Sequence, residues 1–107
     1  MNESDSVRVI RLSGELEISR KREIHDALAI SGDGAPVLLD FSEVTYADSI
    51  ALTELLRFCA AAERDGRPVA LVIRTPQFAR LVQYAGLANA FKIFTDSTQA
   101  LEYLASG

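Results

Sequence analysis

The order of apolar and polar positions divides the chain into strand-like and helix-like segments. Residues 7–12 alternate imperfectly between apolar and charged side chains, which predicts a partly exposed strand. Residues 37–41 and 69–73 are apolar with little or no alternation, a pattern typical of strands covered on both faces. Residues 91–94 predict a final short strand. The segments at residues 37–41 and 69–73 should therefore both be central strands of a sheet.

Helical spacing of apolar residues fills the intervals between these strands. A first helix is expected over residues 19–32, and a later one should start at Pro76, directly after the cap residue Thr75. A final helix is expected after the cap residue Asp96. The clearest apolar stripe belongs to the helix over residues 50–64 and consists of Leu52, Leu55, Leu56, Cys59 and Ala62.

Strands that alternate with helices predict an α/β fold. We expect a single domain over residues 7–107, with a mostly parallel central sheet of four to five strands and about four α-helices. The N-terminal strand should lie at an edge of this sheet, where antiparallel pairing is open to it. Residues 1–6 are short, polar and acidic, and we expect them to be disordered.

The net charge limits the classes of partner that we expect, and the single cysteine bears on the cellular compartment. Eleven basic and fifteen acidic residues give a net charge of −4, which repels phosphate backbones and anionic lipid surfaces. The longest apolar run, residues 69–73, is far shorter than the roughly 20 residues that cross a bilayer. We therefore expect no nucleic acid partner and no direct membrane insertion. The lone Cys59 and the lack of a secretory signal favour the cytoplasm.

The inventory of reactive side chains argues against an enzyme. Cys59 and His25 are too few for a zinc site, and Ala47 and Ala51 flank Ser49 where a nucleophile elbow carries glycines. The helical phase of His25 lies off the apolar stripe, so we interpret it as an exposed surface residue and not as a base for Ser49. No catalytic residue, metal ligand or cofactor is expected, while a small-molecule ligand stays open.

The junction between the first central strand and the following helix is the best candidate site. Asp48 and Ser49 stand there, and the helix is expected to begin at Ile50. A serine at such a junction caps the helix, faces solvent and can receive a phosphate without disturbing the core. Spacing alone favours a cap without regulation. Glu15 and Glu17 share one side of an extended segment, and we interpret them as recognition residues.

Four motifs, taken in order, resemble the STAS domain over roughly residues 7–105. They are LSGELE at 12–17, VLLDFSEV at 37–44, YADS at 46–49 and GRPVALV at 66–72. This domain is shared by bacterial anti-sigma factor antagonists and the cytoplasmic tails of sulphate transporters. Each motif alone is common, whereas their order and spacing together are fairly specific.

The resemblance implies a phosphorylation switch. In family members of this size, the serine that matches Ser49 is phosphorylated by a cognate serine kinase, which is itself the anti-sigma factor. The unphosphorylated domain binds that kinase and frees the sigma factor. Asp48 matches the acidic residue before this serine, and Glu15 and Glu17 match an acidic segment close to it.

The same resemblance places a partner-binding surface on the helix that follows Ser49. We expect Ile50, Thr53, Glu54 and Arg57 to extend this surface, with Glu54 and Arg57 on the exposed side of the helix. The expected partner is a protein, an anti-sigma factor with a kinase fold. Formation of a homodimer stays open.

A second interpretation follows from a departure at the serine motif. After the Asp-Ser pair the family usually has a small residue and then glycine, whereas this chain has Ile50 and Ala51. A contact that is never phosphorylated fits this pair of residues. The alternative is therefore a non-phosphorylated STAS subunit of a membrane lipid-transport ATPase complex.

Overall fold

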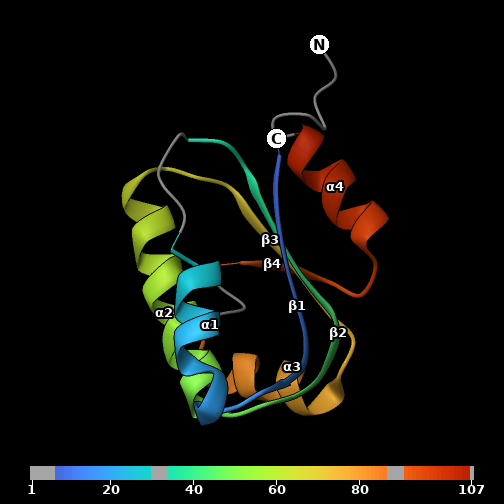
Figure 1. Cartoon of the computed structure of the whole chain (residues 1–107). Helices are drawn as coiled ribbons and strands as arrows, with labels where there is room; N and C mark the ends of the chain where they lie inside the picture. Colours follow the sequence, from blue (N-terminus) through green and yellow to red (C-terminus); the bar gives the residue numbers. More distant parts are fainter. Residues whose placement is uncertain (1–6, 30–33, 87–90, 107) are drawn as a thin grey trace.

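Four parallel strands form the sheet in a computed structural model that describes residues 7–29, 34–86 and 91–106 (Figure 1). They are β1 (Arg8–Leu16), β2 (Val37–Ala47), β3 (Val69–Ile73) and β4 (Lys92–Phe94), in that order across the sheet. The α/β fold with a parallel sheet is thus confirmed. The edge position of β1 is also confirmed, but the antiparallel pairing open to it is wrong, since β1 pairs parallel with β2. A connection through a helix returns the chain to the same end of the sheet and so makes neighbouring strands parallel.

Four α-helices and one short 3₁₀ segment surround this sheet in the described residues. The 3₁₀ segment η2 (Ile18–Arg20) leads into α1 (Lys21–Ala27), so the first predicted helix is split. The remaining helices are α2 (Ser49–Arg64), α3 (Pro76–Tyr84) and α4 (Ser97–Ser106). In Figure 1, α1 and α2 cover one face, α4 covers the other, and α3 lies at the end where β1 and β2 finish.

Each face of the sheet has its own core. The larger core lies under α1, α2 and α3, where the rings of Phe41 and Phe78 stack with centroids 5.9 Å apart. The smaller core lies under α4, where Ala100 and Leu104 cover Leu38 and neighbouring residues of β3. Alternate residues of β2 serve the two cores because successive side chains of a strand point to opposite faces.

Strand β2 is longer than the apolar run that predicted it. Its pairing with β1 contains two register shifts, between Arg11 and Ser13 and between Gly14 and Glu15 of β1. These irregularities let β2 continue as far as Ala47, so that its last residues lie beside the end of β1. The polar stretch that follows the apolar run thereby carries the chain to the predicted site.

Two expectations cannot be compared with the structure. The proposed disorder of residues 1–6 and the predicted end of the first helix near residue 32 both lie outside the described residues. Within the described ranges, each helix falls short of the length or the apolar character that crossing a membrane requires.

Candidate functional site

The junction between β2 and α2 is built around the side chain of Asp48. Asp48 has an extended backbone, with φ −105° and ψ −171°, and its Oδ1 accepts a hydrogen bond from the N–H of Ile50 at 2.9 Å. Asp48 is therefore the N-cap, and the prediction that Ser49 caps the helix is wrong. Ser49 is instead the first helical residue, one position earlier than the predicted start. The reason is geometric, since a cap must precede the helix to reach its unpaired N–H groups.

Because Asp48 supplies the cap, the Ser49 hydroxyl is not used in capping α2. Ser49 is exposed, and its hydroxyl has no hydrogen-bond partner among the described residues. The next residue on the same side of α2, Thr53, donates from its own hydroxyl to the Ser49 carbonyl oxygen at 2.9 Å. Ser49 is thus an exposed hydroxyl at a helix N-terminus, where the helix dipole favours a negative charge.

Two side chains at the start of α3 bind the backbone of β2 just ahead of the junction. The side-chain amide of Gln77 donates to the carbonyl oxygen of Ala47 at 2.6 Å and accepts from the Ala47 N–H at 3.0 Å. The hydroxyl of Thr75 donates to the Val44 carbonyl oxygen, so Thr75 makes no side-chain cap of α3. The predicted place of Thr75 as the N-cap of α3, directly before Pro76, is nevertheless confirmed. Thr75 thus holds β2 at Val44, and Gln77 holds it at Ala47, directly before Asp48. The sequence did not single out Gln77.

The two predicted acidic residues lie at the same end of the sheet as Ser49. Glu15 pairs in register with Tyr46 at the end of β2, and the N–H of Asp48 donates to the Leu16 carbonyl oxygen at 3.0 Å. Glu15 is exposed, whereas Glu17 is half-buried and accepts from the Ser19 hydroxyl at 2.8 Å. The end of β1 therefore presents carboxylates beside the junction.

Arg20 shapes this acidic segment, although the sequence analysis missed it. Its Nη1 donates to the carbonyl oxygens of Ser13 and Glu15, at 2.7 and 2.8 Å. Its Nε and Nη2 bind the Glu23 carboxylate at 3.0 and 2.7 Å, and this hydrogen bonding raises the pKa of Arg20 and lowers the pKa of Glu23. Next to this contact, Gly14 has φ +75°, a backbone conformation that favours glycine.

The outward side of α2 continues from Ser49 along one stripe. Its exposed members, at helical spacing, are Ser49, Thr53, Leu56, Arg57, Ala60, Glu63 and Arg64. Thr53 and Arg57 are exposed as expected. Leu56 was predicted to be buried, which is wrong, since 45% of it is exposed. Phe58 is buried instead, because the inward arc runs through Ala51, Leu55, Phe58 and Ala62 at helical spacing.

Glu54 is the largest error in the predicted surface. It was expected on the exposed side, but it is only 2% exposed. Glu54 lies three residues after Ala51 and four before Phe58, both buried, so helical phase was the signal that would have placed it inward. A buried carboxylate requires a partner. Nδ1 of His25 supplies it at 2.9 Å from Glu54 Oε1, while Arg57 Nε lies 3.9 Å from the same oxygen.

His25 therefore has a different role from the one predicted. Its side chain is 45% exposed, yet it connects α1 to α2 through Glu54 instead of standing alone on the surface. The pair is a structural link between the two helices that flank the site.

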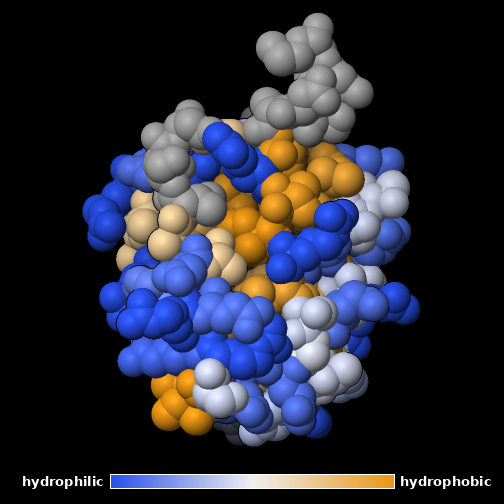
Figure 2. Space-filling model, viewed as in Figure 1, coloured by the Kyte–Doolittle hydropathy of each residue, from blue (hydrophilic) through white to orange (hydrophobic). Residues whose placement is uncertain are grey.

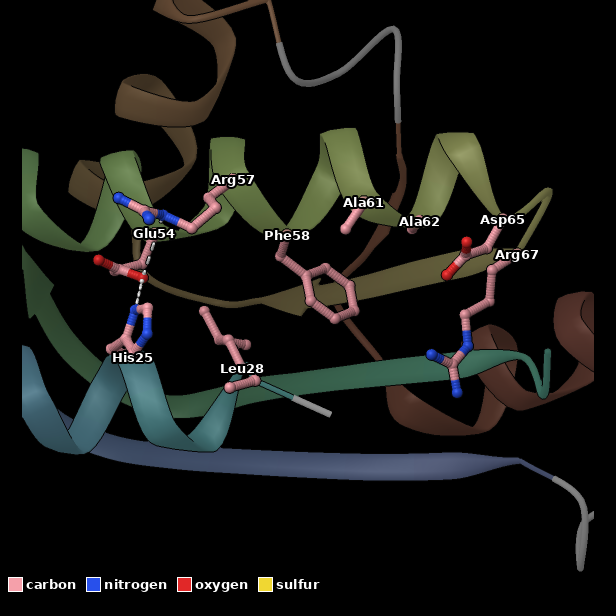
Figure 3. Close-up of a pocket in the computed structure, with 10 residues that line it drawn as sticks. His25, Leu28, Glu54, Arg57, Phe58, Ala61, Ala62, Asp65 and Arg67 are labelled. Atoms are coloured by element: carbon pink, nitrogen blue, oxygen red, sulfur yellow. Dashed lines mark hydrogen bonds and ion pairs between the residues drawn. The ribbon is translucent and has the colours of Figure 1, made fainter. Parts of the chain in front are cut away.

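A narrow groove between α1 and α2 continues from this pair (Figure 3). His25 and Glu54 lie at one end, Asp65 and Arg67 lie at the other, and the Phe58 ring lies between them. Its volume is about 190 Å³, whereas pockets for small ligands usually measure roughly 300 to 1,000 Å³. We therefore interpret the groove as a packing feature between the helices.

The described residues give little support for a cysteine nucleophile or for a metal site. Burial, with a further contribution from Glu63, raises the pKa of the Cys59 thiol and so disfavours the thiolate that acts as a nucleophile. Across residues 7–29, 34–86 and 91–106, no three His, Cys, Asp or Glu side chains are grouped to hold a metal ion. The exposed junction at Ser49 remains the best candidate site.

Comparison with known proteins agrees with this architecture. A family model described as "Mlab, STAS domain" matches residues 1–95. An anti-sigma factor antagonist from Mycobacterium paratuberculosis has a similar structure, with a TM-score of 0.82, 24% identity and coverage of 94% of this chain and 86% of that chain. A putative anti-sigma factor antagonist from Thermotoga maritima has a TM-score of 0.81, 22% identity and coverage of 94% and 88%. No curated protein matches the chain.

Proposed function

Since the chain belongs to the STAS domain family, we propose that it is an anti-sigma factor antagonist that binds a kinase-type anti-sigma factor and is released by phosphorylation of Ser49. The observation that carries this proposal is the exposed Ser49 hydroxyl, which the Asp48 cap leaves without a partner among the described residues. The fold shared with the anti-sigma factor antagonist from Mycobacterium paratuberculosis and the putative one from Thermotoga maritima supports the same class.

The proposed contact area, here called the switch surface, surrounds this hydroxyl. It comprises Glu15, Glu17, Asp48, Ser49, Ile50, Thr53, Leu56 and Arg57. Leu56 replaces Glu54 in the surface expected from the sequence, because Leu56 is exposed and Glu54 is buried. The exposed Leu56 adds apolar area to the surface beside the small hydroxyl residues, and burying that area against a partner would favour binding.

A phosphate on Ser49 would act on the complex and not on the fold. It adds about −1.5 to −2 charge at a helix N-terminus, where the dipole favours an anion by roughly 0.3 to 1 kcal/mol. In a docked complex the same phosphate would lose water next to the Asp48 carboxylate, and burying an uncompensated charge costs several kcal/mol. A cost of about 4 kcal/mol weakens binding roughly a thousandfold.

Phosphate transfer to Ser49 can be tested directly by intact mass. The domain is incubated with the candidate anti-sigma kinase and ATP, together with Ser49→Ala and Ser97→Ala. Ser97 is a matched control, because Asp96 Oδ1 accepts from the Thr98 N–H at 3.0 Å, just as Asp48 accepts from Ile50. One added phosphate on wild type and Ser97→Ala, and none on Ser49→Ala, is expected. An unchanged wild-type mass, or phosphate on Ser49→Ala, would reject the switch.

A second candidate function is a STAS subunit that holds an ATPase partner of a membrane lipid-transport complex without phosphorylation. Ile50 favours it, because this β-branched residue is only half-buried and enlarges the surface beside Ser49, where a kinase must approach. Ala51 adds nothing to that surface, since it is 1% exposed. Affinity purification separates the candidates: a membrane-associated ATPase supports the second, and a soluble kinase with a sigma factor supports the first.

A further inference from the structure

The outer edge of β1 offers hydrogen-bonding groups that no other strand of the described sheet uses. The strand order places β1 at the edge, and the Arg8 N–H donates inward to the Pro36 carbonyl oxygen at 2.8 Å. In a parallel pair, alternate residues bond to the neighbouring strand. Arg8 and Ile10 therefore face β2, while Val9 and Arg11 direct their N–H and C=O groups away from it.

The other half of the same edge is closed by Arg20. Its guanidinium donates to the carbonyl oxygens of Ser13 and Glu15, which also point away from β2. Within the part of the chain that the structure describes, the open stretch thus extends over residues 7–11. Open edges of this kind are sites where another extended segment can pair.

The side chains of the open stretch are unusually apolar for an exposed edge. Val9 is 42% exposed, and Val7 and Ile10 are half-buried. Figure 2, which views the molecule from the side of β1, shows an apolar area here between more hydrophilic regions. A bound strand would cover these side chains while it pairs with the backbone.

The positive charge of the open edge indicates which kind of segment can bind there. Arg8 and Arg11 are both exposed, on opposite sides of the strand, and 75% of the Arg11 side chain is accessible although its Nε contacts Asp40. A second copy of this stretch would bring four arginines together on two paired five-residue segments, and like charges across strands destabilise pairing. Acidic residues three positions apart, with apolar residues between them, would face both arginines.

We infer that the edge at residues 7–11 binds an acidic, extended segment of another protein by β-strand addition. The segment pairs with Val9 and Arg11 and ends where Arg20 closes the edge. This contact lies toward the opposite end of β1 from the switch surface and does not depend on phosphorylation of Ser49.

A titration followed by amide NMR tests the inference with defined probes. The acidic probe is acetyl-Thr-Glu-Val-Val-Glu-Thr-amide, and the control peptide carries Lys in place of each Glu. The acidic peptide should shift the amide signals of Val9 and Arg11 and slow their exchange with solvent. The lysine peptide should bind at least tenfold more weakly. No shifts at millimolar acidic peptide, or shifts elsewhere only, would overturn the inference.

Val9→Pro isolates the backbone contact. Proline removes an N–H that faces away from β2 and so leaves the ladder to β2 intact. The affinity of the Val9→Pro variant for the acidic peptide should be at least tenfold lower than that of the wild type. If this variant does not fold, exchange in the wild type still decides: fast exchange of the Val9 and Arg11 amides that slows with peptide supports the inference. Protection of both amides without peptide, in a dimer by sedimentation, assigns the edge to a second copy and overturns it.

Discussion

Gln77 and Ala47, separated by 30 positions in the sequence, are joined by two hydrogen bonds of 2.6 and 3.0 Å. One side-chain amide satisfies both backbone groups of Ala47, which is fully buried. Ala47 is the last residue of β2 and directly precedes Asp48 and Ser49. The position of the Ser49 hydroxyl therefore depends on a side chain from α3.

Gln77→Ala should destabilise the domain by about 1 to 3 kcal/mol, because it leaves a buried N–H and a buried C=O of Ala47 unpaired. The measurement is the free energy of unfolding in urea. Gln83→Ala is the control, since Gln83 lies on the same helix and is exposed. Equal stability of the two variants would show that the contact to Ala47 contributes nothing.

Substitution of Asp48 and substitution of Ser49 by alanine should change the stability of the domain by very different amounts. Asp48→Ala loses the acceptor for the Ile50 N–H and should cost about 1 kcal/mol. Ser49→Ala removes an exposed hydroxyl and should change stability by less than about 0.5 kcal/mol. Urea unfolding of both variants measures this, and a larger loss for Ser49→Ala would restore serine as the cap.

The link between α1 and α2 can be measured as a coupling between His25 and Glu54. A double-mutant cycle with His25→Ala and Glu54→Ala should give a coupling energy of about 0.5 to 3 kcal/mol, because the two side chains are in direct contact. The matched cycle pairs Glu54→Ala with Arg57→Ala. Arg57 is 65% exposed and 3.9 Å away, so its coupling should stay below about 1 kcal/mol. The reverse order would contradict the assigned partner.

Asp40 should contribute to acid sensitivity. Burial alone would raise the pKa of its carboxyl, but hydrogen bonds from the Ser42 side chain and backbone, with Arg11, outweigh burial and lower it. A lowered pKa stabilises the fold at pH values above the unfolded pKa of about 3.9, and this contribution is lost as pH falls through the folded pKa. The stability gap between wild type and Asp40→Asn should therefore shrink in acid.

Urea unfolding at a series of pH values measures that gap. Ser42→Ala is the companion variant, because loss of the Ser42 hydroxyl bond at 2.7 Å should raise the pKa of Asp40 and move the acid transition upward. A gap independent of pH would mean that the Asp40 carboxyl has the same pKa in the folded and unfolded chain.

Local patterns were sufficient for most of the architecture. The uninterrupted run at Val69–Ile73 is a fully buried strand, and the apolar stripe through Leu55, Cys59 and Ala62 faces the core. These features depend on side-chain periodicity within one element, which the sequence displays directly. The place of the junction at Asp48 and Ser49 followed from the same periodicity.

The supports of the site were beyond such patterns. Glu54 pairs with His25 at a separation of 29 positions, and Gln77 binds Ala47 at 30. Helical phase directs Glu54 inward, but a glutamate is normally exposed, and the partner that makes its burial favourable lies on another helix. The partners in such tertiary contacts cannot be identified from local sequence patterns. These contacts determine which side chains lie on the surface around Ser49.

The affinity of the domain for its kinase-type anti-sigma factor, with phosphoserine incorporated in place of Ser49, tests the switch most directly. Phosphoserine in place of Ser97, after the cap of α4, is the matched control. Calorimetry should show binding weakened on the order of a thousandfold by the phosphate at 49 and nearly unchanged by the phosphate at 97. Equal affinities for the unmodified domain and both phosphorylated forms would contradict the switch.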